Sequence, residues 1–203
     1  MITFVTLRDV WSKLSQESFE RIFSDWEMMI GLEAELTSEE IHIAADVAEV
    51  ESVMDCDKVV IATRIEGTCE GPIYFAFPAT LAMEIVGEVL MIPEQARADK
   101  VEEGLGESEI EAFREMANLL CGSSNMIFQG LEKDLRISQS VDHLQVWGGP
   151  DTSGIMKSKI PEDRMVYIER GVIVGGVPFK IIQMVPFDAA FAITATFEES
   201  EAA

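Results

Sequence analysis

The sequence is poor in basic residues and has no long apolar run. Its 203 residues include 15 Lys and Arg against 37 Asp and Glu, which gives a formal net charge of −22. Such a charge repels phosphate backbones and anionic membrane surfaces, so we expect neither nucleic acid nor membrane as a partner. No stretch approaches eighteen uninterrupted apolar residues, and the N-terminus lacks a basic segment followed by a long apolar run. We therefore expect a cytoplasmic protein.

Residues that commonly bind metals or form disulfides are also scarce. Cys56, Cys69 and Cys121 are odd in number, far apart and without a CxxC spacing, which is typical of reduced thiols rather than disulfides or a metal knuckle. The two histidines, His42 and His143, each lack a second ligand at metal-binding spacing. Glycine-rich segments do not have the spacing of a phosphate-binding loop. The sequence therefore predicts no metal site and no cofactor of its own.

Apolar residues make up 48% of the chain, enough for one substantial core. We expect a single domain over residues 1–203, with a core at 15–196 and an acidic tail at 197–203, and two fused half-domains would also fit. Helical spacing of apolar residues predicts a first long helix over 8–31, ending at Gly31.

The rest of the chain shows mostly strand patterns. Residues 40–50 and 58–78 read as strands, the latter as a hairpin with Gly67 and Gly71 at its turn, and Pro78 can open a short helix. Residues 92–109 are polar and acidic, which predicts an exposed connection between two halves. Strands are predicted in three further segments, 134–149, 164–176 and 178–197.

Residues 110–129 have the pattern of an amphipathic helix. At about 100° per residue, one stripe should face the core, and it contains Ile110, Phe113, Ala117, Leu120, Cys121, Ser124 and Phe128. The opposite face holds Glu111, Glu115, Asn118, Gly122, Asn125 and Gln129. We predict one continuous helix over 108–128 with Glu115 and Asn118 exposed on the same face.

Two plainer interpretations of this segment remain open. In the first, Glu115 and Asn118 are ordinary solvated residues of an exposed helix face. In the second, Gly122 ends the helix after Cys121. A glycine inside a helix costs about 1 kcal/mol relative to alanine. If the helix continues past Gly122, that cost suggests that a partner approaches the backbone there.

The run Glu115-x-x-Asn118 followed by "LLCGSSNMIF" resembles the E-x-x-N helix of the CheC/CheX/FliY family of chemotaxis phosphatases. "FSDWEMMIGLEAEL", "IEGTCEGPIYFAFPATLAMEIVGEVLM" and "LRISQSVDHLQV" are similar to other segments of the family, in the same order. The resemblance covers roughly residues 15 to 145. It implies an α/β fold in which two long helices pack on an extended antiparallel sheet with pseudo-two-fold symmetry.

The resemblance also implies a function. Family members hydrolyse the aspartyl phosphate of a CheY-like receiver, whose own Mg²⁺ serves the reaction, and Glu115 and Asn118 match the catalytic pair. Glu111, Gly122 and Asn125 would contact the phosphorylated receiver. Aligning Gly31 with Gly122 places Ser24 and Glu27 at the positions of Glu115 and Asn118, so the first helix lacks the pair. We therefore expect the single-site, CheX-like pattern, which implies a homodimer.

A different class of function remains as the alternative. The same helix would serve a non-catalytic binding module, or a flagellar-switch component, that docks a phosphorylated receiver without turnover. The pathway would be chemotaxis or another two-component system.

Overall fold

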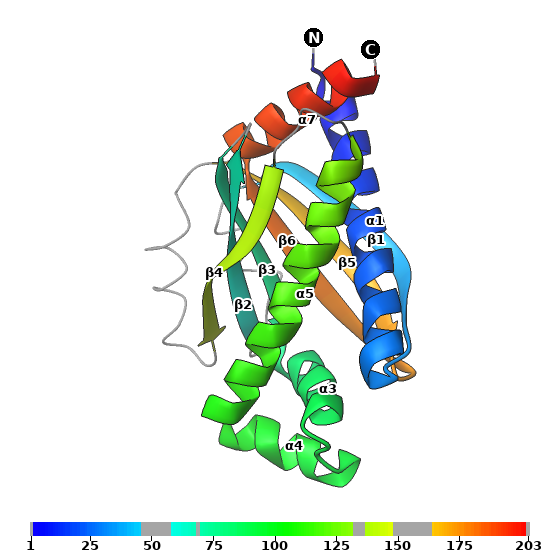
Figure 1. Ribbon diagram of the computed structural model, residues 1–203, viewed down its shortest axis with the longest axis vertical. Coiled ribbons are helices and arrows are strands. Elements are labelled where there is room, and N and C mark those ends of the chain that lie inside the picture. Colours follow the sequence, from blue (N-terminus) through cyan, green and yellow to red (C-terminus); the bar gives the residue numbers. More distant parts are fainter. Residues whose placement is uncertain (1, 46–57, 68–69, 132–136, 148–163, 202–203) are drawn as a thin grey trace.

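The chain folds as one antiparallel sheet with two long helices across it (Figure 1). The computed structural model describes residues 2–45, 58–67, 70–131, 137–147 and 164–201. In chain order the elements are α1 (Phe4–Ile30), β1 (Ala34–Ala45), β2 (Lys58–Gly67), β3 (Gly71–Pro78), α3 (Ala79–Val89), α4 (Glu94–Glu103), α5 (Glu107–Leu131), β4 (Ile137–Trp147), β5 (Met165–Val174), β6 (Val177–Pro186) and α7 (Phe187–Glu201). The long helices α1 and α5 lie side by side on one face and run in opposite directions (Figure 1). The predicted fold class is confirmed.

The order of the strands gives the sheet a pseudo-two-fold symmetry. The order is β1-β5-β6-β3-β2-β4, and every neighbouring pair is antiparallel. Helix α1 is followed by three strands and α3, and α5 is followed by three strands and α7. Each half places its first strand at the edge, beside the second strand of the other half. The two halves therefore share one sheet and one core.

Helix α1 is held against the sheet and against helix α7 by apolar packing and by buried polar contacts. Trp11 is 1% exposed, and its indole Nε1 donates a hydrogen bond to the carbonyl oxygen of Ala190 on α7 at 3.1 Å. Arg170 on β5 is also buried and donates to the Ser15 hydroxyl at 3.2 Å, while its guanidinium pairs with Glu39 on β1. A buried guanidinium is stable only when it is paired and hydrogen-bonded, and both conditions hold here.

The predicted connection at 92–109 is mostly exposed and joins the two halves, as expected, but Glu94–Glu103 within it form helix α4. Arg97 on α4 is 9% exposed, and its guanidinium pairs with Glu84 at 2.6 Å and with Glu88 at 2.7 Å, both on α3. Arg97 fills the space beside Gly87, where the Cβ of any other residue would collide with the Arg97 Nε. The segment is polar in sequence because this helix is held by ion pairs rather than by an apolar stripe.

The predicted strand over 178–197 is correct only as far as Pro186. The chain then forms α7, in which the side chains of Ala190, Ile193, Thr194 and Phe197 are buried. Their i, i+3, i+4, i+7 spacing is that of a helix face. The helix continues to Glu201, so Phe197 belongs to the core rather than to an acidic tail. No helix among the described residues combines the length and the apolar character needed to cross a membrane.

Helix α4 is also linked to the start of α5. Glu109 is 3% exposed, and its carboxylate accepts a hydrogen bond from the Lys100 ammonium at 2.8 Å. The Lys100 hydrogen bond is the main cause that lowers the pKa of Glu109 to about 2. This contact fixes the first turn of α5 against its neighbour.

The low pKa of Glu109 predicts a pH dependence of stability. A carboxyl group with a pKa of about 2 when folded and an ordinary pKa of about 4.5 when unfolded stabilises the fold above pH 4.5. This contribution is lost as the pH falls towards 2. We expect Glu109→Gln to lower the free energy of unfolding by about 1–3 kcal/mol at pH 7.

Urea denaturation of the parent protein and of Glu109→Gln between pH 7 and pH 2.5 measures this contribution. The difference between the two proteins should shrink steadily below pH 4.5. A difference that stays constant over this range would contradict the assignment.

Candidate functional site

The candidate site lies on α5, which is one continuous helix from Glu107 to Leu131. Its predicted core stripe is confirmed, because Phe113, Ala117, Leu120 and Phe128 are each at most 4% exposed. The helix does not end at Gly122. The alternative in which the helix stops after Cys121 is therefore excluded.

Contacts along its length fix the rotation of α5 about its own axis. Near the start, the ring of Phe113 packs edge-on against Phe77 of β3, with centroids 5.4 Å apart. In the second half, the hydroxyl of Ser123 donates a hydrogen bond to the carboxylate of Asp25 on α1 at 3.0 Å. Sequence reasoning missed this contact, since no local pattern relates two residues 98 positions apart. The outer face of α5 is thus held in one orientation.

Glu115 and Asn118 lie on this outer face, and both side chains are exposed. They are three residues apart, so their Cβ atoms are separated by about 5–6 Å, as for any such pair on one helix face. Within the part of the chain that the structure describes, neither side chain has a hydrogen-bond or ion-pair partner. A carboxylate and a carboxamide are therefore presented together, with their hydrogen-bonding groups available to a second molecule.

The three residues assigned to partner binding differ in their surroundings. Gly122 is exposed, and a Cβ placed on it would meet no atom within 4 Å. Glu111 is exposed and pairs with Arg114 one turn along the same helix, at 3.3 Å. Asn125 is half-buried. Nothing in the described fold requires a glycine at position 122, so its cost in helix stability has no internal explanation.

The described residues support neither a cysteine nucleophile nor a metal site near Glu115 and Asn118. Cys121 is 3% exposed, and burial raises the pKa of its thiol to about 12, so the thiolate required of a nucleophile is disfavoured. Among the described residues, no group of three or more His, Cys, Asp or Glu side chains could hold a metal ion. Cys56 and Cys69 lie outside the described residues. The side chain of His143 on β4 also lies outside the description.

The pseudo-two-fold symmetry identifies the counterpart of the site on α1. Buried positions on the two helices match when 102 is added to the residue number, as for Leu7 with Glu109, Val10 with Ala112 and Leu14 with Met116. With this offset, Lys13 corresponds to Glu115, Gln16 to Asn118 and Glu20 to Gly122. The alignment of Gly31 with Gly122 was wrong, because Gly31 has a φ of 71° and ends α1, whereas Gly122 lies inside α5.

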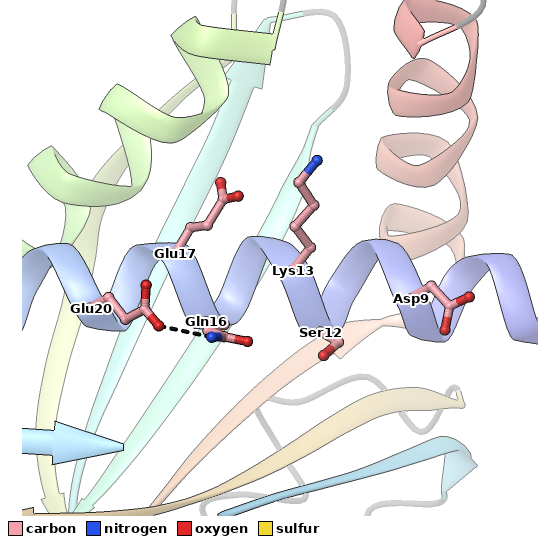
Figure 2. A pocket seen from close by; sticks show the side chains of 6 residues that line it. All are labelled: Asp9, Ser12, Lys13, Gln16, Glu17 and Glu20. Carbon is pink, nitrogen blue, oxygen red and sulfur yellow. Dashed lines mark hydrogen bonds between the residues drawn. The ribbon is translucent and has the colours of Figure 1, made fainter. Parts of the chain in front are cut away.

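The side chains on α1 are arranged differently from those of the site on α5. Figure 2 shows the side chain of Gln16 directed towards Glu20, and its amide donates a hydrogen bond to the Glu20 carboxylate at 2.8 Å. The ammonium of Lys13 lies 5.1 Å from the ring centroid of Phe197 on α7. These side chains belong to a shallow hollow of about 400 Å³ lined by Asp9, Ser12, Lys13, Gln16, Glu17 and Glu20.

The expectation that α1 lacks the pair is therefore correct, although the positions compared were not. At the counterpart of the pair, a lysine replaces the glutamate, and the carboxamide is already engaged by a neighbouring carboxylate. Glu20 on α1 is the counterpart of Gly122 on α5. Of the two long helices, as far as the structure describes them, α5 presents an unpartnered carboxylate and carboxamide beside an open stretch of helix and α1 does not.

Comparison with known proteins gives matches in structure alone. No protein-family model matches the sequence, and no curated protein matches it. The fold is similar to Thermotoga maritima FliY, with a TM-score of 0.77 and 17% identity, covering 98% of this chain and 100% of that chain. It is similar to the FliM middle domain from H. pylori, with a TM-score of 0.71 and 9% identity over 96% and 99% of the two chains. CheX from Desulfovibrio desulfuricans gives a TM-score of 0.53 and 12% identity over 85% and 99%.

These likenesses agree with the architecture described above, in which two α-β-β-β-α halves share one antiparallel sheet. They extend over nearly the whole of FliY, FliM middle-domain and CheX chains. The resemblance predicted from the sequence is confirmed at the level of the fold: this chain has the CheC/CheX/FliY fold.

Proposed function

We propose that this protein is a phosphatase of the CheC/CheX/FliY family that hydrolyses the aspartyl phosphate of a CheY-like receiver. One observation carries the proposal. Glu115 and Asn118 are exposed and unpartnered within the described chain, one turn apart on a helix that is fixed against the sheet and against α1. Such a helix can enter the phosphorylation pocket of a second protein without first rearranging its own contacts.

The reaction requires little chemistry from the phosphatase itself. A water oxygen forms a bond to phosphorus while the bond from phosphorus to the aspartyl oxygen breaks, which releases inorganic phosphate and a free carboxylate on the receiver. The receiver's own Mg²⁺ and lysine stabilise the charge on the phosphoryl group. The phosphatase therefore has only to place a water in line with the leaving oxygen.

Asn118 is suited to placing that water. Its carboxamide oxygen accepts a hydrogen bond from water, and its NH₂ group can donate one to a phosphoryl oxygen, all without a charge. A carboxylate at the same position would be repelled by the phosphoryl group. Asn118 is thus the residue that we assign to the attacking water.

Glu115 is suited to a different contact. Its exposed carboxylate, one turn before Asn118, can pair with the receiver's lysine and so align α5 with the phosphorylation pocket. The bare surface at Gly122 lies one turn beyond Asn118 and would let the receiver's backbone approach the helix. Glu111 and Asn125 extend the same contact at either end.

A second candidate function is a flagellar-switch component that docks a phosphorylated receiver without turnover. The observation that favours it is the higher TM-scores with FliY and the FliM middle domain, 0.77 and 0.71, than with CheX, 0.53. One fold can carry either function, so the fold alone does not separate the two. A measurement of turnover does.

Substitution of Asn118 tests the proposed chemistry. Asn118→Ala should lower kcat for receiver dephosphorylation by about 100-fold, because the attacking water loses its positioning contact. The free energy of unfolding should change by less than about 0.5 kcal/mol, since the side chain is exposed. Glu115→Ala should raise KM as well as lower kcat, because it also removes a docking contact.

For comparison, Glu111→Ala, one turn earlier on the same face, should raise KM only slightly and leave kcat unchanged, because Glu111 is assigned to the edge of the docking contact and its carboxylate also pairs with Arg114. The variants are compared by the rate of phosphate release at equal helicity. Equal activity of Asn118→Ala and the parent protein would favour the binding function instead.

Gly122→Ala separates stability from function. A Cβ at this position meets no atom within 4 Å, and alanine is favoured in helices by about 1 kcal/mol. The variant should therefore unfold at higher urea concentration. If the receiver approaches the backbone at Gly122, the same variant should have a higher KM. A more stable variant with an unchanged KM would show that no close approach occurs there.

The net charge predicts how association depends on salt. At −22 formal charges, the protein should attract a basic surface on its receiver over about one Debye length, roughly 10 Å at 0.1 M salt. The association rate measured by stopped flow should therefore fall as salt rises from 0.02 to about 0.5 M. A rate that is indifferent to salt would count against electrostatic steering.

A further inference from the structure

Exposed methionines lie around the candidate site, on both of the long helices. Met126 on α5 is 51% exposed and lies one turn beyond Gly122 on the outer face. Met28 on α1 is 76% exposed. Exposed apolar surface rimmed by polar residues marks sites that bind another protein, whereas a single exposed apolar side chain is common on any surface.

The contact between α1 and α5 places these two methionines relative to the site. Asp25 and Ser123 are hydrogen-bonded across the seam between the helices. Met28 lies three residues after Asp25, and Met126 lies three residues after Ser123, so each is the next residue on its own helix along that seam. Because the helices run in opposite directions (Figure 1), the two methionines lie on opposite sides of the Asp25–Ser123 contact.

The spacing can be set out from helix geometry. At 1.5 Å per residue, Asn118 lies about 7.5 Å before Ser123 along α5, and Met28 lies about 4.5 Å from the seam contact in the same direction. Met28 is therefore within about 3 Å of the level of Asn118, one helix away, and packed helices are about 8–10 Å apart. Met126 lies about 12 Å from Asn118 along α5 itself.

We propose that Met28 and Met126 form an apolar docking rim that seats the phosphorylated receiver beside Asn118. This inference rests on the proposed function, since the receiver is the occupant. The rim is continuous with the catalytic face, because Asn118, Gly122 and Met126 follow one another at four-residue intervals on the outer side of α5. Helix α1, which lacks the catalytic pair, thereby contributes to binding at the site on α5.

The rim supplies an interaction that the rest of the face lacks. In the proposed complex Glu115 pairs with positive charge on the partner, and an exposed ion pair contributes little affinity, about 0–1 kcal/mol. Burial of a methionine side chain is worth more, and its flexible thioether adapts to an irregular surface. The receiver should therefore carry an apolar patch about 8–12 Å from its aspartyl phosphate.

The test uses receivers from the same organism, each loaded with beryllofluoride as a stable mimic of the aspartyl phosphate. Dissociation constants are measured for the parent protein and for Met28→Gln, Met126→Gln and the double variant. The matched control is Met91→Gln in the turn after α3, where the methionine is 89% exposed but distant in sequence from both helices. All four variants should unfold within about 0.5 kcal/mol of the parent protein.

We expect the double variant to bind the receiver at least tenfold more weakly and Met91→Gln to bind within twofold of the parent protein. With phosphorylated receiver, the double variant should have a higher KM and an unchanged kcat at saturation. An unchanged dissociation constant in the double variant, or an equal loss in Met91→Gln, would overturn the docking rim. Loss of self-association by light scattering without loss of receiver binding would also overturn it, in favour of a contact between two copies.

The docking proposal and the proposed activity can fail separately. If the beryllofluoride-loaded receiver binds through the methionines but the phosphorylated receiver does not lose its phosphate faster in the presence of the protein, only the phosphatase assignment fails. If phosphate is released but the methionine variants behave like the parent protein, only the docking rim fails. If no receiver binds the parent protein, the docking rim is overturned as well.

Discussion

The apolar stripe of α5 must be buried against the sheet, and this packing turns the opposite face of the helix to solvent. Phe113, Leu120 and Phe128 belong to the main core, and Phe113 contacts Phe77 directly. Because these side chains fix the helix rotation, Glu115 and Asn118 have one orientation. Contacts to Lys100 and Asp25 add to the restraint at the two halves of the helix. A site on such a helix is preorganised, which is the property that positioning catalysis depends on.

The pseudo-two-fold symmetry shows how one scaffold supports two different surfaces. Helices α1 and α5 bury equivalent positions, so the same packing rules apply to both. Their outer faces are not constrained by the core and carry different residues. On α1, Gln16 is hydrogen-bonded to Glu20, whereas Asn118 has no partner among the described residues and its neighbour is a bare glycine. The asymmetry supports a single catalytic face in the proposed function, with α1 in an accessory role.

Sequence reasoning succeeded where burial follows hydrophobicity. The α5 stripe and the outward direction of Glu115 and Asn118 could be predicted from apolar periodicity. Helix α4 could not, because the burial of Arg97 depends on Glu84 and Glu88 of another helix. The alternation of Ala, Thr and Phe in α7 imitates a strand although its buried residues have helical spacing. Alignment by glycines also failed, since a helix-ending glycine and a mid-helix glycine have different physical roles.

Turnover is the property that separates a phosphatase from a protein that only binds the receiver. The most direct measurement adds the parent protein at about one-hundredth of the concentration of a phosphorylated receiver, purified from the same organism, and follows inorganic phosphate over time. The account predicts that each molecule releases many phosphates and that the receiver loses its phosphate much faster than it does alone. Release limited to one phosphate per molecule, or at the receiver's own rate with every receiver tried, would contradict it.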